Sequence, residues 1–453
     1  MTTAPLTWLQ IFRLGLAQAA LGAVVVLTTS TLNRIMVVEL ALPAALPGAL
    51  VALHYAMQVL RPRLGHGSDV GGRRIPWIIG GMATLAFGGV GAALATAMMG
   101  TFFWQGIALA IVSFFMIGVG VGACGTTLLV LLAKRVNERR RAAAATIVWV
   151  TMIFGFIVTT AISGYFLDPY SPSRLVAVAA AVSIIAMTIT TVAVWNIEGS
   201  EPEHVTQTAT ASSRDTSFVT VLTEVWAEPA ARRFAIFIFV SMIAYSAPEL
   251  ILEPFAGSVF GLTPGQSTTL ASVQHCGVLA GMALAAILGS ATVRPRFVSM
   301  QTLMVSGCVA SAMALFNLAA TGLAAPTGAL RTAVFLLGLS NGVYAVAAIG
   351  SMMALAGTGR ESREGIRMGL WGAAQAIAFG LGGFVGTLAC DFVKILLGSP
   401  SAAYPTVFAG EAVLFLLSAV LSIRIHADQK RPAPRRFPGV VEFPISNASR
   451  SRS

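Results

Sequence analysis

The stretch G-H-G-S-D-V-G-G-R-R, Gly65–Arg74, separates two strongly apolar parts of the chain. Its four glycines permit a tight reversal of the backbone. Asp69 can lie at the N-terminus of a neighbouring helix, where the helix dipole favours an anion. Arg73 and Arg74 can pair with that carboxylate or with lipid phosphate. The stretch therefore predicts a polar turn between two helices at a membrane surface. On its residues alone, the turn can serve as a topology anchor.

The composition extends this prediction to the whole chain. Only 10% of the 453 residues are charged and the mean hydropathy is +0.81, whereas about a quarter of an average soluble domain is charged. About twelve stretches approach the roughly 20 apolar residues that span a bilayer, and they must be helices because lipid offers the backbone no hydrogen bonds. These stretches cover residues 12–33, 44–60, 76–97, 103–132, 142–166, 174–195, 233–256, 267–289, 297–320, 328–356, 367–397 and 405–425.

The net charge of +11 raises the question of a nucleic-acid partner. The positions of the basic residues argue against one. With a cytoplasmic N-terminus, 25 of the 29 Lys and Arg residues fall on the cytoplasmic side. This follows the positive-inside rule with both termini inside. We therefore expect a multi-pass membrane protein that binds membrane lipids and no nucleic acid. The four basic residues on the other side are Arg34, Arg174, Arg331 and Lys394.

Polar segments divide the apolar stretches into two groups of six. Residues 1–195 are expected to form one six-helix half and residues 233–425 the other. Residues 196–232 are rich in Ser and Thr and are expected to be a cytoplasmic linker. The basic tail, residues 426–453, is expected to be disordered and attracted to anionic headgroups. Basic turns recur after the second and eighth stretches, which favours two related halves.

Charged residues inside apolar stretches are costly and are functional candidates by default. Arg34 and Glu39 end the first stretch, and Glu249 and Glu253 lie at the matching depth of the seventh. If the halves are related, Arg34 is expected to pair with Glu253 or Glu249. The pair then either closes the outer side as a structural contact or serves a ligand or a proton.

Other residues extend this charge network. Pro248 and Pro254 bracket the glutamates and are expected to break their helix, which frees backbone carbonyls. Asp391, in the eleventh stretch, is a further candidate, with Lys394 one turn away.

Two histidines, His54 and His275, lie in or beside apolar stretches. A neutral imidazole there can bind the magnesium of a chlorin, or it can be a hydrogen-bonded core residue. The four cysteines have no metal-ligand spacing and are expected to be small buried hydrophobes. The chain has no G-x-S-x-G, P-loop or H-E-x-x-H motif. We therefore expect no enzymatic activity.

The stretch quoted first resembles the loop between helices two and three of the major facilitator superfamily, G-x-L-A-D-R-x-G-R-R. Five positions match in register, and the Leu, Ala and first Arg of the pattern are Gly67, Ser68 and Val70 here. The resemblance implies an all-α fold of about twelve transmembrane helices in two pseudo-symmetric six-helix halves. In that family the loop latches the cytoplasmic side. The matching residues are Gly65, Asp69, Gly72, Arg73 and Arg74.

Two further stretches narrow the resemblance. L-N-R-I-M-V-V-E-L-A-L-P-A (Leu32–Ala44) and L-I-L-E-P-F (Leu250–Phe255), together with G-S-D-V-G-G-R-R-I-P-W, are similar to the PucC, or bacteriochlorophyll-delivery, branch. The usual features of proton-coupled exporters are missing, because residues 103–132 carry no charge and residues 142–166 no proline.

This resemblance implies an assembly factor for photosynthetic light-harvesting complexes in the intracytoplasmic membrane. It would carry bacteriochlorophyll, with His54 and His275 as candidate magnesium ligands. Its implied partners are antenna polypeptides, the reaction centre–antenna core complex or bacteriochlorophyll synthase. The alternative is a secondary transporter of a small solute that works by alternating access and uses the same carboxylates for coupling.

Overall fold

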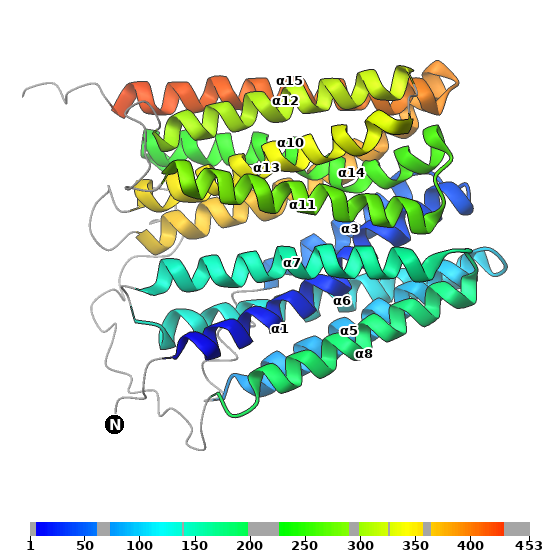
Figure 1. Cartoon of the computed structure of the whole chain (residues 1–453), viewed down its shortest axis with the longest axis horizontal. Coiled ribbons are helices and arrows are strands. Elements are labelled where there is room, and N and C mark those ends of the chain that lie inside the picture. Colours follow the sequence, from blue (N-terminus) through cyan, green and yellow to red (C-terminus); the bar gives the residue numbers. More distant parts are fainter. Residues whose placement is uncertain are drawn as a thin grey trace, which may run out of the picture.

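The computed structural model describes residues 6–60, 73–137, 140–197, 226–289, 299–324, 327–356 and 364–429, which form a bundle of long helices (Figure 1). Eleven helices in these ranges are long and apolar enough to cross a membrane. The expected second span is a shorter apolar helix. The chain is thus an all-α, multi-pass membrane protein.

The first helices run in the order given by the sequence. The first span is continuous but changes its winding along its length. It consists of α1 (Trp8–Val26), the π-helical turn η1 (Leu27–Thr31), α2 (Leu32–Arg34) and a second π-helical turn η2 (Ile35–Glu39). The rest of this group comprises α3 (Ala45–Met57) with the 3₁₀ turn η3 (Gln58–Leu60), α5 (Ile75–Met99), α6 (Phe103–Arg135), α7 (Arg141–Leu167) and α8 (Pro172–Val194).

The second group packs beside the first. Its helices are α10 (Pro229–Phe260), α11 (Pro264–Gly289), α12 (Met300–Ala324), α13 (Thr327–Ala356), α14 (Glu364–Leu397) and α15 (Pro400–Gln429). The helix α10 begins four residues before the boundary at residue 233 that the apolar pattern predicts. Pro229 is favourable in the first turn, where its missing N–H has no partner to lose.

Local sequence explains several helix ends. Thr7 caps α1 in a capping box with Gln10, and Ser171 caps α8 by accepting a hydrogen bond from the N–H of Arg174. Gly261 ends α10 in the left-handed region, at φ 67°. There its N–H donates to the carbonyl of Gly257.

The bundle has two ends, which we name from the first span. The near end is where α1 begins at Trp8, and the far end is where η2 finishes at Glu39. Both described termini lie at the near end (Figure 1). The described basic residues gather there, as the sequence predicts. The exceptions, in the far half, are Arg34, Arg174, Arg331 and Lys394.

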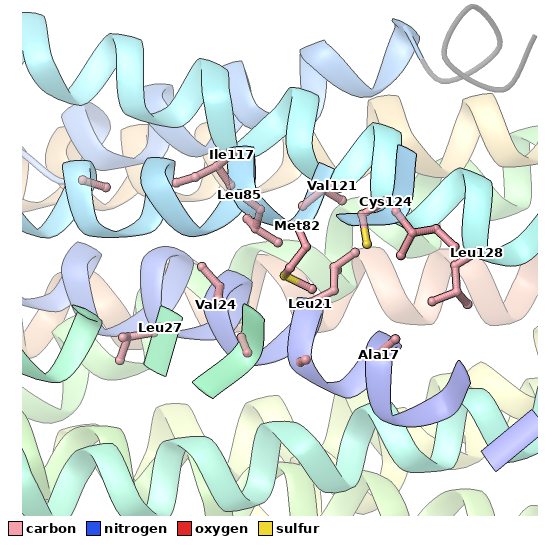
Figure 2. Packing of buried hydrophobic residues seen from close by; sticks show 14 of the residues in the cluster. Ala17, Leu21, Val24, Leu27, Met82, Leu85, Ile117, Val121, Cys124 and Leu128 are labelled. Carbon is pink, nitrogen blue, oxygen red and sulfur yellow. The ribbon is translucent and has the colours of Figure 1, made fainter. Parts of the chain in front are cut away.

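Each group of helices encloses its own apolar core. In the first group, α1, α5 and α6 interdigitate through Leu21, Met82 and Cys124, among others (Figure 2). Large apolar side chains such as Phe87, Trp104 and Ile395 point outward and are exposed. Such a surface suits hydrocarbon rather than water. One cysteine departs from the expected burial, because Cys276 lies on the exposed face of α11, while the other three are buried.

Glycines set the closest helix contacts. Where α11 crosses α13, a Cβ placed on Gly281 would lie 2.0 Å from the carbonyl oxygen of Leu339. A Cβ on Gly410 of α15 would meet nothing within 4 Å. Small residues that let backbones approach are the usual means of packing helices in lipid.

We expect Gly281→Ala to destabilise the protein by about 1–3 kcal/mol, because the added methyl group collides with backbone that cannot turn aside. Gly410→Ala should be neutral or slightly stabilising, since alanine favours a helix. Thermal unfolding of both variants in the same detergent provides the measurement. Equal melting temperatures for the two variants would contradict the packing described here.

Candidate functional site

The first span presents polar side chains to the second group of helices. The π-helical turns η1 and η2 shift the register of the span, and π turns of this kind often occur at functional sites. Four polar residues near these turns are buried against α10 and α11. We call the interface that they form with those helices the polar seam; its members are Ser30, Thr31, Asn33, Arg34, Glu249, Glu253, Thr268 and Gln274.

Arg34 has a different partner from the one expected. Its Nη1 lies 2.5 Å from Oε1 of Glu39 and its Nη2 donates to the carbonyl of Leu262 at 2.6 Å. The prediction of an ion pair with Glu253 or Glu249 was therefore wrong. The turn η2 brings Glu39 back alongside Arg34. The guanidinium also passes closely over Gly257, where a Cβ would lie 2.9 Å from Nη2.

The two glutamates of α10 are held by neutral groups. Glu253 is buried and accepts hydrogen bonds from the hydroxyls of Ser30 and Thr268, the latter at 3.4 Å. Glu249 accepts one from Nε2 of Gln274 at 3.1 Å. Neither carboxylate is bonded to a cation among the described residues. Glu253 lies between the two groups of helices, where a proton or a polar ligand could exchange with its neutral partners.

The prolines beside these glutamates do not break α10, which continues through Pro248 and Pro254. Pro254 has no N–H, so the carbonyl of Leu250, four residues earlier, loses its helical partner. The side-chain amide of Asn33 donates to that carbonyl instead. The expected break was wrong, but the expected free carbonyl is present and joins the two groups of helices.

Asp391 closes a second contact between the groups. Its carboxylate accepts hydrogen bonds from the N–H groups of Ala44 and Ala45, at 3.0 and 2.8 Å. These are the first N–H groups of α3, which has no partner for them within itself. Lys394 lies exposed one turn further along α14 and is not the partner of Asp391.

Asp168 makes the equivalent contact on the other side of the bundle. It ends α7, and its carboxylate accepts from the N–H of Gly265 at 3.1 Å and from the hydroxyl of Thr263 at 2.6 Å. The helix capped here is α11. Asp168 was not a candidate in the sequence. It directly follows the last residue of α7, whereas Asp391 lies inside α14, which continues to Leu397.

The correspondence between the two contacts extends one turn deeper. Four residues before Asp168, Gly164 packs on Thr269, where an added Cβ would lie 2.4 Å from the Thr269 hydroxyl. Four residues before Asp391 is Thr387, and a Cβ on Gly48 would lie 2.1 Å from its hydroxyl. We call these contacts, α7–α11 through Asp168 and α3–α14 through Asp391, the twin clasps. Both join the two groups of helices at the far end.

The histidines differ in how they are held. Nδ1 of His275 lies 2.7 Å from the carbonyl of Ala271, and Phe156 of α7 packs edge-on at a ring distance of 5.1 Å. His54 is buried with its Nε2 3.2 Å from Nε2 of Gln58, and its ring lies 4.8 Å from that of Tyr55. The structure places the histidines on different helices and does not bring them together.

Only part of the latch motif is described by the structure. Gly65, Asp69 and Gly72 of the latch motif fall outside the described residues. Arg73 and Arg74 lie directly before α5, and Arg74 is buried. Sequence reasoning also missed Glu411 of α15, which is buried and accepts no hydrogen bond from the described part of the chain. No cluster of His, Cys, Asp or Glu side chains suited to a metal ion occurs there either.

Known proteins resemble this chain over nearly its full length. The sequence matches the family described as "PUCC protein" over residues 31–430. A Rhodobacter capsulatus protein named "Bacteriochlorophyll synthase 44.5 kDa chain" is 51% identical, over 93% of this chain and 96% of that protein. "Protein PucC" from the same organism is 27% identical, over 91% of each.

Solved structures confirm the fold. A D-xylose–proton symporter superposes with a TM-score of 0.68 and 13% identity, over 92% of this chain and 97% of the other. A peptide transporter superposes with a TM-score of 0.66 and 13% identity, over 92% and 94%. These neighbours have the major facilitator superfamily fold.

We expect Asp391→Asn to loosen the far end, because an amide is a weaker acceptor than a carboxylate for the two N–H groups of α3. Spin labels on the exposed Ser173 of α8 and Ser401 of α15, in a Cys276→Ser background, should give a broader and longer distance distribution in pulsed electron resonance. The matched control is Lys394→Gln, which changes a charge on the same helix end without touching a clasp. An unchanged distribution in Asp391→Asn would show that the clasp does not hold the far end.

Proposed function

This chain belongs to the PUCC protein family, and on that premise we propose that it binds bacteriochlorophyll and delivers it to antenna polypeptides during assembly of light-harvesting complexes. The names of its relatives support a role with this pigment and its complexes. We place the protein in the bacterial inner, intracytoplasmic membrane. The basic residues at the near end favour a cytoplasmic position for both termini.

The observation that carries the proposal is the setting of His275. The carbonyl of Ala271 is a hydrogen-bond acceptor only, so Nδ1 of His275 must carry the proton. The lone pair is then on Nε2, which accepts no hydrogen bond from the described residues. Metal-binding histidines commonly donate their other N–H to a carbonyl in this way. His275 therefore fits a chlorin magnesium, and the pigment would supply the metal.

Phe156 gives that position an aromatic wall. It packs between His275 of α11 and Gly22 of α1, where an added Cβ would lie 2.4 Å from the phenyl ring. A macrocycle bound to His275 would thus lie where α1, α7 and α11 meet, and loading it requires α7 and α11 to separate. We propose His54 as a second, weaker candidate, because its Nε2 already contacts Gln58.

We propose that the chain itself is not catalytic, although one relative is named as a chain of a synthase. Pigment delivery requires binding, release and contact with the synthase, the antenna polypeptides or the core complex. Opening of the polar seam and the twin clasps would let the two groups of helices move as units during that exchange. No step in this scheme requires a nucleophile or an acid–base pair in the protein.

We expect protein purified in mild detergent from a phototrophic host to carry a near-infrared bacteriochlorophyll band. His275→Ala should lower the pigment-to-protein ratio at least several-fold, because the magnesium loses its protein ligand. His54→Ala should lower it less. Absorption spectra normalised to protein provide the measurement.

The control is His275→Gln, which keeps a polar side chain of similar size, and the melting temperature of each variant reports folding. A band of full intensity in both alanine variants would be compatible with pigment delivery but would exclude His54 and His275 as magnesium ligands. A colourless wild-type preparation without antenna or synthase subunits would reject delivery.

The second candidate function is solute transport, and the contacts of Glu253 favour it. This carboxylate is buried between the two groups of helices with Ser30 and Thr268 as its partners. A coupling proton would alter both contacts. In proteoliposomes, a pH gradient should then drive solute uptake that Glu253→Gln abolishes and Lys394→Gln leaves intact. Delivery of pigment alone predicts no such uptake.

A further inference from the structure

An open cleft lies beside one of the twin clasps. It is a cleft of about 1010 Å³ between α7 and α8, bordered by the first turns of α11 and α13. Asp168 of the clasp lines it. We call it the α7–α8 cleft. It is separate from His275, which does not line it.

Apolar side chains form most of its wall. Ile162, Tyr165 and Phe166 of α7 and Ile185 of α8 line the cleft and are each more than half exposed. Exposed apolar residues on spanning helices face hydrocarbon, so the cleft opens sideways into the membrane. A soluble, strongly hydrated solute would gain little from such walls.

Two arginines line the part of the cleft nearest the far end. Arg174 comes from the start of α8 and Arg331 from the start of α13, so they belong to different groups of helices. Arg174 donates to the carbonyl of Pro169 at 3.0 Å, which leaves most of its N–H groups unused. Arg331 is exposed and has no hydrogen bond or ion pair within the described part of the chain.

Basic residues are scarce in the far half of the bundle, so two arginines that line the same cleft indicate an anionic ligand. Of the four there, Arg34 is bonded to Glu39 and Lys394 lies outside the cleft. The remaining two converge on one cleft. The nearby carboxylate of Asp168 already accepts bonds from Thr263 and Gly265. The site thus has an excess of positive charge.

The residues of α8 that line the cleft indicate how long a bound ligand can be. Arg174, Ala177, Ala181 and Ile185 line the cleft at helical spacing. Eleven residues of helix rise roughly 16 Å, about half of the ~30 Å hydrocarbon core. The cleft therefore combines a cationic mouth with an apolar groove as deep as one leaflet.

We propose that the α7–α8 cleft binds one anionic phospholipid. Its phosphate lies between Arg174 and Arg331, and its acyl chains run along α7 and α8. Because the arginines come from different groups of helices, the lipid bridges the two groups beside the Asp168 clasp. Bacteriochlorophyll is a poorer occupant, because it carries no anionic head and no histidine lines the cleft.

Native mass spectrometry of the detergent-purified full chain tests this proposal. Titration with phosphatidylglycerol should reveal one tightly held molecule, and phosphatidylcholine should bind at least tenfold more weakly. The double variant Arg174→Gln/Arg331→Gln should lose at least tenfold in phosphatidylglycerol affinity, because both guanidinium groups are gone. Lys394→Gln is the control for charge in the same half.

A steric variant keeps the test valid if the double variant folds poorly. Ala181→Trp should fill the groove and displace the lipid, whereas Ile184→Trp, on the same helix but outside the cleft, should not. Equal affinity for both lipids, or unchanged binding in Ala181→Trp and the double variant, would overturn the proposal. Displacement of phosphatidylglycerol from the wild-type protein by added bacteriochlorophyll would assign the cleft to pigment instead.

Discussion

A helix that begins inside a membrane protein has backbone N–H groups without partners, and lipid supplies none. For two helices that begin at the far end of this protein, α3 and α11, the partners come from the other group of helices. Asp391 of α14 satisfies the first turn of α3, and Asp168 of α7 satisfies that of α11. The same principle applies to carbonyl groups. The side chain of Asn33 donates a hydrogen bond to the carbonyl of Leu250, and that of Arg34 donates one to the carbonyl of Leu262. The contact between the groups at the far end is therefore directional as well as apolar, and separating them exposes backbone groups on both sides.

Much of this architecture could be predicted from the sequence, for identifiable reasons. Hydropathy and charge are local properties, so the spans and the basic near end follow from composition. Pairings between distant residues do not: Asp391 meets Ala44, 347 positions away. The partner of Arg34 was missed because π-helical winding moves Glu39 beside it, and no residue pattern in the first span indicates that winding. The contact of Asn33 could be predicted in part. Pro254 implies a free carbonyl at Leu250, but the sequence does not show which side chain bonds to it.

The twin clasps show that the two groups of helices correspond in individual contacts as well as in the order of their helices. Each clasp combines an aspartate in the far part of one helix with a glycine–threonine contact one turn deeper. The glycine belongs to the aspartate's own helix in one clasp and to the capped helix in the other. What the clasps share is the geometry of a carboxylate over a helix start. Sequence comparison of the halves would miss this, because the Gly and Thr positions are exchanged.

The helix pair α7–α11 connects the two ligand proposals. A phospholipid that contacts Arg174 and Arg331 together favours the state in which the halves are joined at the far end. Pigment on His275 requires α7 and α11 to separate around Phe156. A ligand shifts a conformational equilibrium only through its different affinity for the two states, and the coupling between two ligands is reciprocal. If both ligands bind as proposed, each must therefore weaken the other. Membrane lipid composition would then set how readily the protein takes up or releases pigment, without any lipid touching the pigment site.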